Sequence, residues 1–246
     1  MTHLNQRKLN EIEHGKKIAG NAEAIWGHAK KAGQARIERR IKAMIDLGVI
    51  NSSSKVLELG CGTGEFTKRL AETGAEVVGM DISPDLLEIA RKKLSSFSNV
   101  KFIQTDMETL EGIDENYFTA IVGNSVLHHV DYEACFRECL KRLHVGGKIV
   151  FSEPNMVNPQ IAIQKNIPFI KKMVGDSPDE TAFFRWNLSA LLKGIGYKKI
   201  SVENFDFLHP FMPDFVVDKI EGPLRWLEEI PIIKEVSGSL LISATK

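Results

Sequence analysis

Three closely spaced glycines and a later carboxylate are the residues of this sequence best suited to hold a ligand. Within residues 55–64, an apolar run leads into Gly60, Gly62 and Gly64. Glycine allows a positive φ and lets a ligand approach the backbone without a Cβ in the way. Asp81 ends the next apolar run, where a carboxylate can accept hydrogen bonds from ribose hydroxyls. The Gly-x-Gly-x-Gly spacing differs from the dinucleotide fingerprint, but the combination predicts a nucleotide-type site.

A second group of residues is suited to proton transfer. His128 and His129 closely follow the apolar run 120–123, and Glu153 follows the run 148–152. The unperturbed histidine pKa of about 6.5 suits a base that deprotonates a hydroxyl near neutral pH. Glu153 would orient a histidine or act as the base itself. The alternative is a pair of structural histidines and a turn carboxylate.

These residues need a scaffold in which strands end at one edge. Helical patterns begin near Glu65, at Ser83-Pro84 and at Asp131, between apolar runs that read as strands. Such alternation predicts a parallel sheet covered on both faces, with ligands at the carboxyl ends of the strands. Polar residues follow the five predicted strands at these ends: Glu58, Asp81, Asp106, Asn124 and Glu153.

With these residues in place, the sequence resembles the class I S-adenosylmethionine (SAM)-dependent methyltransferases. "VLELGCGTG" at 56–64 matches the glycine loop of that family, and "VVGMDIS" at 77–83 matches its ribose-binding strand. The resemblance implies an α/β, doubly wound, seven-stranded mostly parallel sheet with an antiparallel last strand and helical lid insertions. Specific motifs cover residues 55–155, and residues 185–246 agree only in fold. A tight strand–helix turn without a ligand is the alternative.

The resemblance also implies roles in binding SAM, or its product S-adenosylhomocysteine (SAH). Glu58 would hold the loop and the methionine amine, Asp81 the ribose, and Ile82 a face of the adenine. Asp106 would accept from the adenine amine, although it also suits a helix N-cap. Either Arg36 or Arg40 could pair with the methionine carboxylate, or both could belong to a solvated helix face. The full set of expected cofactor residues is Arg36, Arg40, Glu58, Gly60, Cys61, Gly62, Gly64, Asp81, Ile82, Asp106, Met107 and Asn124.

The segment 124–129 bears on the acceptor. It lacks the Asn/Asp-Pro-Pro-Tyr sequence of amide and adenine N-methyltransferases and resembles small-molecule methyltransferases that read "SLHH" here. We therefore expect methyl transfer to oxygen of a small molecule or a glycan or lipid precursor, with His128, His129 and Glu153 as catalytic residues and no metal. One alternative is an RNA or protein methyltransferase. The other is a SAM-binding protein without catalysis.

Composition and charge bear on the class of partner and on the cellular compartment. Lys+Arg and Asp+Glu number 32 each, so no net charge favours nucleic acid as a partner. Three cysteines and no signal peptide favour the cytoplasm, and no apolar run reaches the ~20 residues of a membrane span. Oligomeric state is left open. We expect an N-terminal helical cap over 1–50, with residues 1–20 loosely attached, and a core over 51–246. Two lid insertions are expected in this core, at 154–180 and 208–236.

Overall fold

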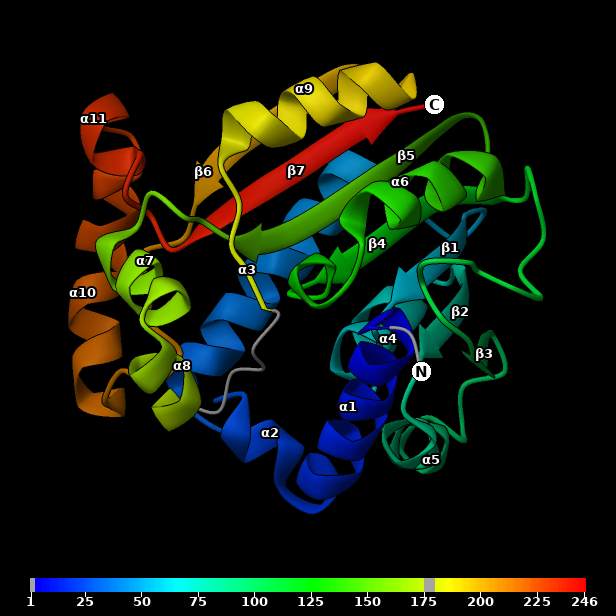
Figure 1. The fold of residues 1–246 in the computed structure, drawn as a ribbon, viewed down its shortest axis with the longest axis horizontal. Helices are drawn as coiled ribbons and strands as arrows, with labels where there is room; N and C mark the ends of the chain where they lie inside the picture. The colour runs from blue at the N-terminus through cyan, green and yellow to red at the C-terminus, as the bar shows by residue number, and fades with distance from the viewer. Residues whose placement is uncertain (1–2, 175–179) are drawn as a thin grey trace.

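The computed structural model describes residues 3–174 and 180–246 (Figure 1). Seven strands form one sheet in the order β3-β2-β1-β4-β5-β7-β6, and β7 runs antiparallel to both of its neighbours. This topology confirms the predicted doubly wound sheet with an antiparallel last strand. The strands are β1 (Lys55–Leu59), β2 (Glu76–Asp81), β3 (Val100–Gln104), β4 (Phe118–Asn124), β5 (Leu143–Pro154), β6 (Lys198–Phe205) and β7 (Ser239–Thr245).

Helices cover both faces of the sheet because successive strand residues point to opposite sides. Val56 and Val77 pack with α3 (Lys31–Gly48) and α4 (Glu65–Ala71) in one buried cluster. Leu57 belongs to a second cluster, which includes residues of α6 (Tyr132–Arg142) and α9 (Arg185–Ile195). The near-continuous apolar strands are thus explained by burial on both faces.

Two predicted helix starts are confirmed by their caps. The Ser83 hydroxyl accepts from the Leu86 N–H at 3.4 Å at the start of α5 (Pro84–Lys93). The Asp131 carboxylate accepts from the Ala134 N–H at 3.0 Å and begins α6. Each cap satisfies a backbone donor that would otherwise lack an intrahelical partner.

The N-terminal residues differ from expectation. The segment expected to be loosely attached instead contains α1 (His3–Ile18), which lies beside α5 and lines the cavity described below (Figure 1). Its contacts include ion pairs of Arg7 and Lys8, which no apolar period signals. The turn η1 (Ala19–Asn21) and the short α2 (Ala22–Ile25) connect it to α3.

The two predicted insertions hold short helices at one end of the molecule, at the left in Figure 1. The first contains α7 (Pro159–Asn166) and α8 (Pro168–Val174), and its residues 175–179 lie outside the described part of the chain. The second contains α10 (Asp214–Leu227) and α11 (Pro231–Lys234), between β6 and β7. Among the described residues, no helix combines the length and apolar content needed to cross a bilayer.

Candidate active site

A cavity of about 400 Å³ opens where the parallel strands end. This volume falls within the roughly 300–1,000 Å³ common for small-molecule sites. Gly64 and Glu153 are buried outside its lining. The structure brings the other expected site residues together around it: Arg36, Arg40, Glu58, Gly60, Cys61, Gly62, Asp81, Ile82, Asp106, Met107, Asn124, His128 and His129.

The glycine loop connects β1 to α4 through backbone that favours glycine. Gly60 has φ 63°, and a Cβ there would collide with the side chain of Val126. Gly64, with φ 82°, caps α4, and a Cβ there would collide with Leu94 beyond α5. Gly60 therefore shapes the cavity wall, whereas Gly64 permits close packing of the two helices.

Asp81 is fixed at the end of β2 by backbone donors. Its Oδ2 accepts from the Gly62 N–H and its Oδ1 from the Ser83 N–H, each at 2.9 Å. Burial raises the pKa of Asp81, although these backbone hydrogen bonds oppose the rise. Each carboxylate oxygen has a second lone pair, so the side chain can still accept from two hydroxyls.

Glu58 lies on the same side of the cavity and is 4% exposed. Its Oε2 accepts from the Thr67 hydroxyl at 2.6 Å. Burial raises the pKa of Glu58 to about 8, and the nearby charge of Asp81 adds to the rise while the Thr67 hydrogen bond opposes it. Without a cation beside it, this carboxyl group is mostly protonated at neutral pH.

The segment after β3 forms a turn as well as a cavity wall. The Asp106 Oδ1 accepts from the Glu108 N–H at 2.8 Å, and its Oδ2 pairs with Lys8 of α1. Asp106 thus stabilises a turn and also lines the cavity. No helix begins at this residue, so the alternative of a helix N-cap is wrong. Met107 and Ile82 add apolar wall next to it.

A buried aspartate joins three arginines of α3. Oxygens of Asp206 lie 3.2–3.3 Å from terminal nitrogens of Arg36, Arg39 and Arg40. Arg40 also donates to Asn124 at 2.9 Å, while its Nε is buried without a hydrogen-bond partner. Burial, together with the charge of Arg40, lowers the pKa of Arg36 to about 9. Both cavity-lining arginines would therefore gain from an added anion.

His128 and Glu153 form a buried pair. His128 Nδ1 lies 2.9 Å from Glu153 Oε2, and Glu153 Oε1 accepts from the N–H groups of Val126 at 2.8 Å and Leu127 at 2.9 Å. Burial, followed by the neighbouring His129, lowers the pKa of His128. Because its oxygens are already engaged, Glu153 is placed to orient His128.

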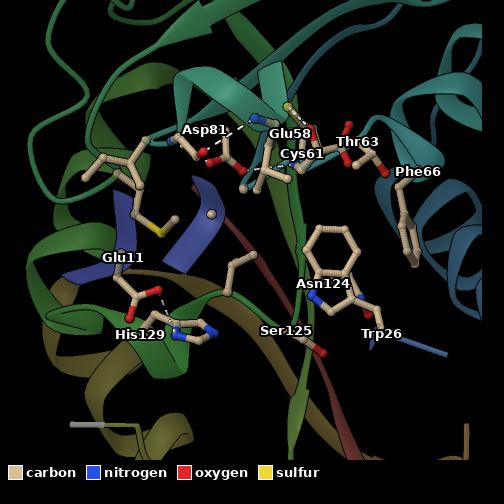
Figure 2. Close-up of a pocket in the computed structure, with 18 of the residues that line it drawn as sticks. Glu11, Trp26, Glu58, Cys61, Thr63, Phe66, Asp81, Asn124, Ser125 and His129 are labelled. Carbon is tan, nitrogen blue, oxygen red and sulfur yellow. Dashed lines mark hydrogen bonds and ion pairs between the residues drawn. The ribbon is translucent and has the colours of Figure 1, made fainter. Parts of the chain in front are cut away.

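His129 lies against the N-terminal helix (Figure 2). Its Nδ1 is 3.4 Å from Oε2 of Glu11 and 3.7 Å from Oε1 of Glu180. Burial alone would lower the pKa of His129, but the carboxylates outweigh it, Glu11 most strongly, and raise this pKa. Figure 2 shows the other ring nitrogen turned toward the interior of the pocket.

Donor atoms of His128, His129 and Glu180 lie within 4.8 Å of one another. This spacing alone does not distinguish a metal site from an ion-pair network. The Lys165 ammonium, however, lies 2.6 Å from Oε2 of Glu180 and already balances that carboxylate. We therefore interpret this cluster as an ion-pair network.

Sequence reasoning missed three carboxylates that support the site. Glu11 and Glu180 approach His129 from distant segments, and Asp206 anchors the arginines of α3. Glu11 lies in a charged stretch without apolar spacing, and Asp206 follows an unremarkable strand. Only the tertiary fold brings these side chains to the cavity.

Parts of the sequence are similar to known methyltransferases. Residues 57–151 match the family model described as "Methyltransferase domain". The putative methyltransferase YqeM of Bacillus subtilis (strain 168) is 34% identical over 101 residues, 39% of this chain and 41% of that protein. Demethylmenaquinone methyltransferase of Staphylococcus aureus (strain JH9) is 31% identical over 138 residues, 54% of this chain and 53% of that protein. The chain thus spans about half the length of the curated relatives it matches.

Solved structures share the fold at low identity. Phosphoethanolamine N-methyltransferase 2 of Haemonchus contortus, in complex with SAM, has TM-score 0.63 and 16% identity over 85% of this chain and 52% of that one. The [4+2]-cyclase SpnF has TM-score 0.63 and 20% identity, and the match covers 85% of this chain and 80% of that one. The fold is that of the Rossmann-like class I methyltransferases. In sequence and in fold, residues 57–151 thus resemble the methyltransferase domain of SAM-dependent enzymes.

Proposed function

We propose that the protein transfers a methyl group from SAM to a small-molecule acceptor, at oxygen, with general-base assistance from the histidine pair. The observation that carries this proposal is the composition of one cavity. Its lining combines the glycine loop and Asp81 with His128 and His129. The expected site of the methyl donor and the proton-accepting histidines therefore line the same cavity.

The residues fit SAM on several grounds. Asp81 has acceptor capacity left for a ribose, and Ile82 and Met107 offer apolar contact for an adenine. The positive charges of Arg36 and Arg40 in the cavity lining suit the methionine carboxylate, and the ionisable Glu58 suits its amine. Cys61, Gly62 and Asn124 would complete this half of the site through backbone and amide contacts.

Bound SAM supplies an electrophilic methyl group on a sulfonium. The protein must hold the acceptor in line with this group, exclude water and take up the acceptor proton. His128, oriented by Glu153, and His129, facing the cavity, are the available proton acceptors. The carboxylate of Glu153 stabilises the imidazolium that forms when His128 accepts a proton.

A small or lipid-like acceptor is the class best supported. The S. aureus relative is named as a methyltransferase of demethylmenaquinone, a small molecule. Equal numbers of acidic and basic residues give no general attraction to nucleic acid. A hydroxyl acceptor also explains why proton-accepting groups lie in the cavity, because a hydroxyl must lose its proton on methylation.

The test is methyl transfer from labelled SAM into a host extract separated into lipid, small polar, RNA and protein pools. The control is Asp81→Asn, which should weaken cofactor binding and reduce the label together. Label in the lipid or small polar pool supports the proposal and starts to identify the acceptor. Label confined to RNA or protein replaces it with a macromolecular methyltransferase.

A second candidate is a protein of this fold that does not transfer methyl groups. The similarity in fold to a protein named as a [4+2]-cyclase motivates it. Micromolar binding of SAM or SAH without label in any pool, including after addition of demethylated quinones, would favour this candidate. The same measurement therefore separates the two functions.

A further inference from the structure

The N-terminal helix forms part of the cavity wall. Six residues of α1 line it: Arg7, Lys8, Glu11, His14, Gly15 and Ile18. They occupy one stretch of the helix, and successive members reach from the turn after β3 toward the start of α5. Figure 1 shows α1 beside α5. The helix is thus placed to contact both halves of the site.

Ion pairs fix one part of α1. Arg7 pairs with Glu108, and Lys8 pairs with Asp106 and lies 3.1 Å from Glu108. The Glu108 side chain is only 7% exposed, so these ion pairs are largely shielded from solvent. It also accepts from the Asp131 N–H at 2.9 Å, which links α1 to the start of α6.

A close backbone contact also fixes α1 nearer its C-terminal end, at Gly15. A Cβ at Gly15 would collide with the Ser83 side chain at the N-cap of α5. Only a residue without a side chain permits this approach. With Lys8 and Gly15 both fixed, the register of α1 is determined, and Glu11 between them lies over His129.

The groups around His129 come from several elements. Glu11 of α1 is the nearest carboxylate at 3.4 Å, and Glu180 follows at 3.7 Å with Lys165 of α7 bound to its far oxygen. The ring of His128 lies 4.1 Å away, centroid to centroid. More distant charges are Glu153 behind His128 and Asp81 at the end of β2.

We propose that Glu11 is a positioning residue for His129, a role that rests on the function proposed above. The Glu11 carboxylate lies 3.4 Å from Nδ1, which makes no hydrogen bond to a described residue in this structure, and its negative charge favours the tautomer with the proton on Nδ1 and the lone pair on Nε2. Nε2 then accepts the proton of the acceptor hydroxyl. The O–H electron pair stays on oxygen, and the positive charge that appears on the ring is balanced by Glu11. Docking of α1 therefore completes the base.

The pair also predicts a pH effect with a definite sign. A carboxylate beside an imidazole favours the protonated ring and raises the histidine pKa. Replacing Glu11 with Gln removes this charge, and the pKa of His129 must fall. The acid limb of the rate profile, where the base becomes protonated, should move to lower pH with it.

The experiment compares Glu11→Gln with Glu11→Asp and with Glu13→Gln. Glu13 is an exposed residue of the same helix that pairs with Lys17, so it controls for helix charge. Glu11→Gln should lower kcat about 10- to 100-fold, a fraction of the ~10²–10⁴ typical of general-base catalysis. The KM for SAM should change less than threefold, roughly 0.65 kcal/mol. Glu11→Asp should restore part of the rate, and Glu13→Gln should match the parent.

Histidine-labelled protein gives a readout that does not need turnover. Titration by NMR, with His129 assigned from His129→Ala, should show a lower pKa in Glu11→Gln than in the parent or in Glu13→Gln. An unchanged His129 titration would overturn the proposal, as would an effect confined to KM. If the parent transfers no methyl group, the proposed function fails, but the titration still decides whether Glu11 controls His129.

Discussion

Nδ1 of His128 and Oε2 of Glu153 lie 2.9 Å apart, in a buried pair that joins the turn η2 (Leu127–His129) to the end of β5. Backbone N–H groups hold the second oxygen of Glu153. The carboxylate cannot rotate toward an acceptor without losing these bonds. Its role is therefore to orient the imidazole and stabilise its charge.

Glu153→Gln should lower kcat by about 10²-fold, the lower end of general-base effects. The amide keeps one acceptor oxygen but removes the negative charge that stabilises protonated His128. Affinity for SAH, measured by calorimetry, should stay within about twofold, roughly 0.4 kcal/mol. Glu133→Gln, on the exposed face of α6, is the matched control. A parental kcat in Glu153→Gln would refute the role of this pair.

Asp81→Asn should weaken SAH binding about 10- to 150-fold, which corresponds to the roughly 1.5–3 kcal/mol of a hydrogen bond to a charged group. The amide retains a single acceptor oxygen for the ribose and for two backbone donors. Calorimetric titration measures the loss, and circular dichroism checks that the fold is intact. Unchanged affinity in a folded variant would remove Asp81 from the ribose site.

Binding of SAH should release protons from Glu58. Its pKa of about 8 in the free protein exceeds the ordinary 4.5, so the group is mostly protonated at pH 7. A ligand ammonium favours the ionised form, and affinity should therefore rise with pH until about 8. Calorimetry in buffers of different ionisation enthalpy measures the proton count. Glu58→Gln should abolish this release, and equal release in both proteins would contradict the assignment.

The same raised pKa affects stability in the absence of ligand. Between pH 4.5 and about 8 the folded protein binds more protons at Glu58 than the unfolded chain does. The contribution of Glu58 to the free energy of unfolding therefore decreases as pH rises through this window. Denaturant unfolding of the parent and of Glu58→Gln should show a difference that shrinks toward the acid end.

Asp206→Asn should destabilise the protein by about 3–5 kcal/mol, the cost of removing one partner from buried ion pairs. The substitution leaves the cluster of Arg36, Arg39 and Arg40 short of one negative charge. Urea unfolding measures the change. Asp218→Asn, which removes an exposed partner of Lys31, should alter stability by less than about 1 kcal/mol. Similar effects of the two substitutions would show that the arginine cluster does not depend on Asp206.

Local sequence signals predicted the sheet because each signal had a local cause. The strands were visible as apolar runs, and the caps at Ser83 and Asp131 marked helix starts directly. The positive φ values at Gly60 and Gly64 explain why glycine occurs at those positions. The cavity lining along the strand ends followed from parallel topology alone.

Other parts of the site depend on contacts between distant segments. Helix α1 docks through Lys8 and Arg7 on carboxylates about one hundred positions away, and such pairings leave no periodic pattern. The anchoring of Arg40 by Asp206 spans 166 positions. A sequence shows the charged residues but not which of them form ion pairs. The arginines were therefore assigned to the cofactor without their buried partner.

The attachment of α1 has a consequence for amide hydrogen exchange. The helix contributes Ile18 to a small cluster with Ala22 and Leu86 but adds no residue to the two large clusters around the sheet. Segments held mainly by ion pairs open at lower free energy than core strands. Amides of α1 should therefore exchange well before those of β1 and β4, and sooner still at high ionic strength, which screens the pairs with Asp106 and Glu108. Ligand access would then require opening of one helix while the sheet stays folded.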